Sequence, residues 1–202
     1  MNFLGRMMSQ AILQLNKRED RRLRAGHLWV FSNEVNVKKT PLHNFAPGQT
    51  VSVVAHDGSF LGTGYVNPNS LICARLISRN ANEKLNRALL LQRLKTALAF
   101  REAFFQKPFY RWCYGESDGL PGLIIDRYGD VIVAQITTAG MENIKDEIIA
   151  TIETIVQPKA LLLRNDSPIR SMEGLIYMSK QPQASYLNWL LCKKMKCYFR
   201  WL

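Results

Sequence analysis

The chain has 202 residues, enough for one or two domains, and its 47% hydrophobic and 21% charged residues are ordinary for a globular protein. No run reaches the eighteen or so apolar residues of a membrane helix, and the start is too weakly apolar for a signal peptide, so we expect a cytoplasmic protein with no membrane contact. The four cysteines lack the spacing of a zinc site or of a disulfide framework, so we expect reduced thiols. The net charge of +11 is uneven, since residues 1–80 carry ten basic and four acidic side chains and residues 113–175 carry five and ten, which favours either an anionic partner for the N-terminal half or a solubilising surface.

The first eighty residues predict a small barrel of short strands, because short apolar runs alternate with turn-forming residues. Strands are expected at 10–15, 28–31, 51–54, 60–66 and 71–77. The tripeptide at 56–58, His-Asp-Gly, is a turn that joins two of these strands into a hairpin. Between the first two strands, residues 19–24 can form one or two helical turns that end at Ala25 and Gly26.

Residues 81–175 predict a helix followed by a second, mixed unit. Apolar side chains recur at helical spacing over 81–106 and again over 142–156. Strands are expected at 109–114, 123–127, 131–137 and 159–164. The predicted fold class is therefore α+β, with an N-terminal β-barrel, a connector helix and a small strand–helix–strand middle domain. The expected boundaries of these three parts are 9–78, 79–108 and 109–175.

Residues 176–202 differ from the rest of the chain, because they contain neither an acidic residue nor a glycine. Average composition would place about three acids in a segment of this length. Aromatic and basic residues dominate it without clear periodicity. We interpret this segment as an atypical, non-native tail.

A cluster of cations near the N-terminus is the main candidate for a binding site. This basic cluster consists of Lys17, Arg18, Arg21, Arg22, Arg24 and His27. Basic side chains neutralise phosphates, and an adjacent aromatic ring can stack on an unpaired base. A solvated helix is the alternative, and we favour phosphate contact for the arginines. We expect Trp29 to lie in the barrel core rather than to stack on a base.

The segment GESDGLPGLIIDRYGD at 115–130 concentrates four acidic residues around a Pro-Gly pair. A phosphate-binding loop needs a lysine after its glycines, and none follows here. The three aspartates would bind Mg²⁺ or Ca²⁺ only if the turns brought them together. We favour a hairpin, because Asp118-Gly119 and Pro121-Gly122 are turn dipeptides and Gly129-Asp130 can form its tip.

The sequence predicts no catalytic, cofactor-binding or metal-binding residues. Its one Gly-x-Gly, at 62–64, continues as a strand instead of opening a helix, so it lacks the context of a dinucleotide loop. His43 and His56 have no nucleophile beside them. Cys73 and Cys113 lie in apolar, strand-like contexts and are expected to be inert thiols of the core.

Three motifs, in this order, carry a resemblance to a known family: LRAGHLWVFS at 23–32, GTGYVNPNS at 62–70 and GESDGLPGLIIDRYG at 115–129. Over residues 8–175 the chain resembles the bacterial large-subunit ribosomal RNA cytosine-5 methyltransferases of the RlmI/YccW type. The resemblance implies a PUA-like RNA-binding domain over 9–78 and a middle domain over 109–175. In the parent family a Rossmann-like domain follows and binds S-adenosylmethionine. The partner that the resemblance implies is ribosomal RNA.

After Leu175 the resemblance stops, and the family's cofactor loop and catalytic cysteine have no counterpart in the sequence. Cys192 and Cys197 lie in the atypical tail and take no catalytic role. We therefore expect the RNA-binding N-terminal portion of an S-adenosylmethionine-dependent rRNA methyltransferase, truncated and inactive alone, with no cofactor bound by this chain. Two alternatives stay open: a stand-alone RNA-binding accessory protein, and a structural module without an RNA role.

Overall fold

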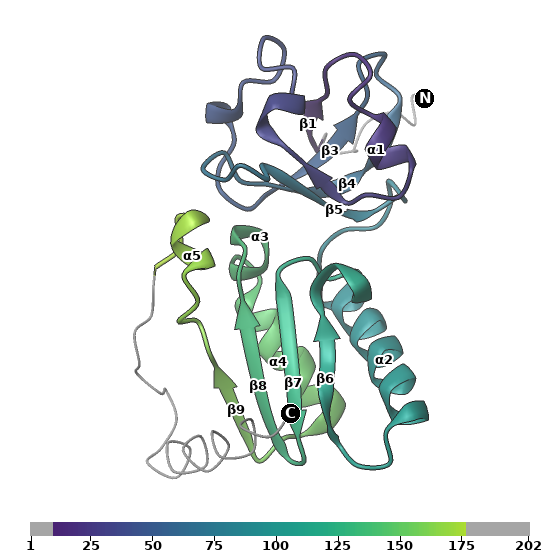
Figure 1. Cartoon of the computed structure of the whole chain (residues 1–202), viewed down its shortest axis with the longest axis vertical. Helices are drawn as coiled ribbons and strands as arrows, with labels where there is room; N and C mark the ends of the chain where they lie inside the picture. Colours follow the sequence, from purple (N-terminus) through teal and green to yellow (C-terminus); the bar gives the residue numbers. More distant parts are fainter. Residues whose placement is uncertain (1–9, 177–202) are drawn as a thin grey trace, which may run out of the picture.

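A computed structural model of the chain describes residues 10–176. Two units are stacked along the long axis of the molecule, an N-terminal curled sheet and a four-stranded sheet with helices on one face (Figure 1). The α+β fold class predicted from the sequence is confirmed. Residues 177–202, with Cys192 and Cys197, lie outside the described residues, so the interpretation of the tail stays a prediction.

The N-terminal unit is a five-stranded sheet in the order β1-β3-β4-β5-β2. Its strands are β1 (Ala11–Gln14), β2 (Trp29–Val30), β3 (Gln49–Val54), β4 (Phe60–Val66) and β5 (Ala74–Ser78). An isolated bridge joins Leu15, after the edge strand β1, to Val35, which follows the other edge strand β2. This contact between the two edges curls the sheet into a barrel around a core of buried Leu and Val side chains.

Two glycines let β4 cross the barrel closely. A Cβ added to Gly62 would lie 2.7 Å from the carbonyl oxygen of Ser78. A Cβ added to Gly64 would lie 2.3 Å from the carbonyl oxygen of Arg75. The register of β4 on β5 shifts between Thr63 and Gly64, as in a β-bulge. The Gly-x-Gly at 62–64 therefore serves backbone packing inside a strand, because only a residue without Cβ fits there.

The second unit is a sheet in the order β6-β7-β8-β9. Its elements are β6 (Phe109–Tyr114), β7 (Leu123–Tyr128), β8 (Val131–Ile136) and β9 (Ala160–Leu163), with α2 (Arg87–Phe104), α3 (Ala139–Glu142), α4 (Lys145–Val156) and α5 (Ile169–Met172). The helices α2 and α4 pack on the same face of this sheet (Figure 1). Their buried leucines and isoleucines form a single apolar core with the strands.

Two helix boundaries differ from those expected from periodicity. The first long helix begins at Arg87 rather than near residue 81, because the Asn86 side chain accepts a hydrogen bond from the Leu89 amide and caps it. The helix expected over 142–156 begins only at Lys145, as α4, and Glu142 belongs to the separate short helix α3. The break lies at Ile144, whose φ of −116° and ψ of 24° leave the helical region.

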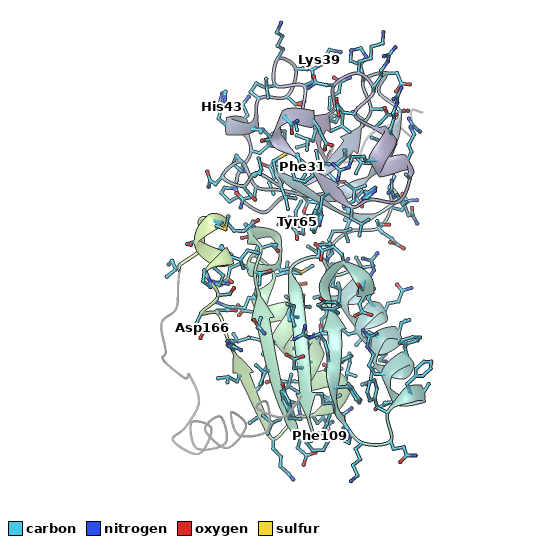
Figure 2. The ribbon with its side chains drawn as sticks, in the orientation of Figure 1. Phe31, Lys39, His43, Tyr65, Phe109 and Asp166 are labelled. Atoms are coloured by element: carbon cyan, nitrogen blue, oxygen red, sulfur yellow. The ribbon has the colours of Figure 1, made fainter. Side chains whose placement is uncertain are left out.

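Tyr65 of β4 holds the two units together. It is buried, its hydroxyl donates to the Pro121 carbonyl at 2.8 Å, and its oxygen lies 3.0 Å from Thr138 Oγ1. Gly140 in α3 packs on the ring, so that an added Cβ would come within 2.2 Å of Tyr65 Cγ. Figure 2 shows Tyr65 at the boundary between the units. Burial raises the pKa of its hydroxyl, so this group stays a neutral donor.

A second connection runs from the end of α5 to the barrel. The buried carboxylate of Glu173 accepts from Arg75 Nη1 at 2.9 Å, from Asn67 Nδ2 at 2.8 Å and from Ser70 Oγ at 3.0 Å. We call these four residues the Glu173 cluster. Because a buried carboxylate needs charge and hydrogen-bond compensation, this cluster fixes α5 beside the barrel, where Figure 1 shows it.

Candidate nucleic-acid interface

Five residues of the basic cluster lie on the turn at 17–20 and on the short helix α1 (Arg21–Arg24), which follows β1, and His27 lies just after this helix. The helix is held by one apolar side chain, Leu23, which is buried in the barrel core. It ends before Gly26, whose φ of +104° suits a residue without Cβ. A single buried anchor leaves the neighbouring cations outside, so Arg21 and Arg24 are exposed.

Three cations of the cluster are available to a ligand. Lys17, Arg18 and Arg21 are exposed, and within residues 10–176 none of their charged groups has a hydrogen-bond or ion-pair partner. The backbone of Arg18 has a φ of +74°, in the left-handed region, as part of the turn at 17–20. Unpaired surface cations are free to neutralise phosphates, and each phosphate that they neutralise releases counterions condensed on the nucleic acid.

The other two arginines have intramolecular partners. Arg22 Nη1 is 2.8 Å from Glu34 Oε1, and its guanidinium lies 5.0 Å from the centre of the Phe31 ring. Arg24 Nε is 2.5 Å from Asp20 Oδ2, and its Nη2 donates to Ser59 Oγ at 2.8 Å. The hydrogen bond from Arg24 lowers the pKa of Asp20. These contacts brace the turn and helix that carry the three free cations.

Trp29 lies on the surface rather than in the core, so the expectation that it is a core residue is wrong. It is 39% exposed, whereas the next residue, Val30, is fully buried. The reason is the alternation of a strand at the edge of a sheet, where only one of two successive side chains faces the core. The indole Nε1 donates to Glu116 Oε1 at 2.8 Å, across the boundary between the units.

An open pocket of about 360 Å³ lies at this boundary, and we call it the junction pocket. It is lined by Gly26, His27, Leu28, Trp29, Glu116 and Ser117. The first four follow α1 directly in the chain, and the last two belong to the 3-10 turn η3 (Gly115–Asp118). His27 is the member of the basic cluster that the fold brings to the pocket. Pattern analysis missed this site because its two sides are 87 residues apart in sequence.

The acidic residues at 115–130 each face a donor, in keeping with the predicted hairpin. Glu116 accepts from Trp29, and Asp118 accepts from both terminal nitrogens of Arg101 at 2.7 Å. Asp126 pairs with Arg111 at 2.8 Å, and Asp130 pairs with Lys159 at 2.6 Å. The hairpin is confirmed, since β7 and β8 pair antiparallel, from Leu123 opposite Ile136 to Tyr128 opposite Val131. Among residues 10–176, no three His, Cys, Asp or Glu side chains are grouped to hold a metal ion.

Cys73 and Cys113 are buried free thiols. Burial raises the pKa of both to about 12, which leaves the thiolate, the nucleophilic form, unpopulated near neutral pH. The expectation that they are core residues is confirmed. In the part of the chain that the structure describes, no helix is long and apolar enough to cross a membrane.

Comparison with known proteins agrees with the motifs. The model of the PUA-like domain family matches residues 13–79. The ribosomal RNA large subunit methyltransferase I of Alteromonas mediterranea is 37% identical over 172 residues, which are 84% of this chain and 42% of that protein. The proteins of the same name from Shewanella amazonensis and Escherichia coli O1:K1 are 36% and 34% identical over 81% of this chain and 41% of theirs. The chain is a relative of these methyltransferases.

The predicted family resemblance is thus confirmed, and the chain spans about two fifths of the length of the curated relatives it matches. Two solved structures share the fold. One, assigned as a SAM-dependent methyltransferase from Streptococcus mutans, is 21% identical with a TM-score of 0.62 over 76% of this chain and 41% of that chain. The other, SMU.776, assigned as a methyltransferase and solved in complex with SAH, is 20% identical with a TM-score of 0.63 over 87% of this chain and 44% of that chain.

Among residues 10–176, no segment has the form of a Rossmann-type loop for S-adenosylmethionine, the cofactor of the parent family. A Rossmann-type loop is a glycine-rich turn between a strand and a helix, with open space in front of the glycines. In the described part of the chain, two segments join a strand to a long helix. The segment before α2 contains no glycine, and the segment before α4 contains Gly140, whose open side is filled by the Tyr65 ring.

Proposed function

We propose that residues 10–176 form the RNA-binding part of an S-adenosylmethionine-dependent rRNA (cytosine-5) methyltransferase, and that they bind ribosomal RNA through the basic cluster. The observation that carries this proposal is the exposure of Lys17, Arg18 and Arg21 without intramolecular partners. A cation that is already paired inside the protein adds little to the affinity for a phosphate. An unpaired cation that neutralises a phosphate contributes the full free energy of counterion release to binding. The relation to the methyltransferases supports rRNA as the class of ligand.

The proposal assigns binding rather than methyl transfer to this part of the chain. Both described cysteines are buried and protonated near neutral pH, so neither can attack a base. In equilibrium dialysis of the full chain against labelled S-adenosylmethionine, we expect no saturable binding. Micromolar affinity for the methyl donor would contradict this assignment.

The test of RNA binding is a pair of charge-matched double variants. We expect Lys17→Ala with Arg21→Ala to weaken binding of a labelled single-stranded RNA of mixed sequence. The plot of log affinity against log salt should become shallower by about 0.7 for each phosphate that the variant no longer neutralises. The control is Lys95→Ala with Lys107→Ala, which removes the same charge from exposed, unpaired positions of the second unit.

Equal affinity and salt slope for the two double variants would refute the proposed interface, because only net charge would then matter. Binding that is weakened only by the variant in the basic cluster would support it. Fluorescence anisotropy at several salt concentrations gives both quantities. Thermal unfolding of each variant shows that the fold is retained, which we expect because these charged groups have no partners within residues 10–176.

A further inference from the structure

We propose that the junction pocket receives one unpaired base of the bound RNA strand, stacked on Trp29, and that Glu116 selects a base with an exocyclic amino group. This inference rests on the proposed function, since the basic cluster supplies the phosphate contacts that bring the strand to the pocket. It assigns to the pocket a ligand class, namely cytosine, adenine or guanine, and it disfavours uracil.

The position of Trp29 is the first step of the argument. An indole that is 39% exposed on a two-residue edge strand loses part of the stabilisation that burial would give it. The ring is nevertheless fixed, because its Nε1 is bound to Glu116 at 2.8 Å. A fixed, partly exposed aromatic ring is the platform on which proteins stack unpaired bases.

The carboxylate of Glu116 is the second step. Its Oε1 accepts from Trp29 and lies 4.0 Å from Arg75 Nε. Among residues 10–176, Oε2 has no hydrogen-bond or ion-pair partner. A carboxylate oxygen accepts hydrogen bonds and donates none, so it prefers the amino groups of cytosine, adenine or guanine. Uracil has no exocyclic amino group, and its one ring donor, N3–H, lies between two carbonyl oxygens that the carboxylate would repel.

The loop that leads into the pocket is held in place, which is the third step. Arg79 donates to the carbonyl oxygens of Leu23 and, at 3.1 Å, of His27. The segment from the basic cluster to Trp29 is therefore tied to the barrel. A volume of about 360 Å³ is near the small end of the ~300–1,000 Å³ typical of ligand pockets. The pocket is shallow and open to solvent, so a base still attached to its strand can reach it.

The test uses the full chain and labelled oligouridylates of equal length with a central U, C, A or G. We expect the three amino-bearing oligonucleotides to bind several-fold more tightly than the all-uridine one. Trp29→Ala should weaken their binding about tenfold without changing the salt slope, because it removes stacking and no charge. Trp29→Phe keeps a ring and should retain most of the affinity. Phe104→Ala removes another exposed aromatic side chain, 72% exposed, and should have no effect.

Glu116→Gln separates selection from stacking. An amide both donates and accepts, so this variant should lose the preference for amino-bearing bases while it keeps the affinity for uridine. The pocket proposal is overturned if Trp29→Ala and Trp29→Phe both bind like the unchanged protein while Lys17→Ala with Arg21→Ala binds weakly. In that case the proposed function survives without the pocket. If the unchanged protein binds no RNA, the proposed function itself fails.

Discussion

Replacement of Glu173 by glutamine tests how strongly α5 is held to the barrel. The Glu173 side chain is almost fully buried, and Arg75, its charged partner, is only 7% exposed. The substitution preserves the shape of the side chain and removes its charge. It leaves the guanidinium with the Glu116 carboxylate, 4.0 Å away, as its nearest remaining counter-charge.

The hydrogen bonds add to this electrostatic cost. Glu173 Oε1 accepts from Ser70 and Arg75, so the glutamine oxygen must take that position, and its NH₂ group then faces Asn67 Nδ2. The Asn67 amide cannot rotate to resolve the conflict, because Nδ2 also donates to the Glu173 carbonyl and Oδ1 accepts from the Asn69 amide. Two donors therefore meet inside the protein.

Removing one partner of a buried ion pair lowers the free energy of unfolding by about 3–5 kcal/mol. We expect a loss near the lower value, because the Glu116 carboxylate still lies near Arg75. A loss of about 3 kcal/mol corresponds to a fall of about 6–12 °C in Tm for a chain of this size. Urea denaturation and thermal melting, followed by circular dichroism, measure both quantities. Glu153→Gln, at an exposed position whose side chain has no partner within residues 10–176, is the matched control. A Glu173→Gln protein within about 0.5 kcal/mol of the unchanged one would refute the reasoning.

Three further predictions concern buried groups. Gly140→Ala should lower the free energy of unfolding by about 1–3 kcal/mol, because the added methyl group overlaps the Tyr65 ring; unchanged urea unfolding would contradict the packing at the boundary. Tyr65→Phe should cost about 1–3 kcal/mol, since Thr138 and a carbonyl oxygen lose a buried partner, and a neutral effect by the same measurement would count against these hydrogen bonds. Cys73 and Cys113 should resist alkylation at pH 8 until denaturant is added, and peptide mapping by mass spectrometry measures the labelling of each thiol. Rapid labelling of the folded protein would argue against their raised pKa values.

Much of the fold could be predicted from local pattern. The strands at 109–114, 123–127 and 131–137 correspond closely to β6, β7 and β8, because alternation and turn dipeptides are local signals. The strand expected over 71–77 begins only at Ala74, and Leu71 is 71% exposed. The helix boundaries were less accurate, because a cap at Asn86 and the tertiary contacts of α3 decide them.

The candidate site could be predicted only in part. A run of cations at 17–24 is visible in any sequence, but its division into three free and two paired side chains is not. Arg22 finds Glu34, and Arg24 finds Ser59, only after the barrel has closed. Whether these cations contact RNA stays a prediction that the binding experiments decide.

By itself, the sequence determined the order of the strands and the two long helices, the basic N-terminal cluster and the family resemblance, because each depends on neighbouring residues or on short motifs. The tertiary structure alone decided that Trp29 faces outward and donates a hydrogen bond to Glu116, that Gly140 packs on the Tyr65 ring, and that Glu173 binds Arg75 of the barrel. These contacts join residues between 75 and 106 positions apart. Such pairs leave no periodic signal, since they depend on how two separately patterned units meet at one boundary.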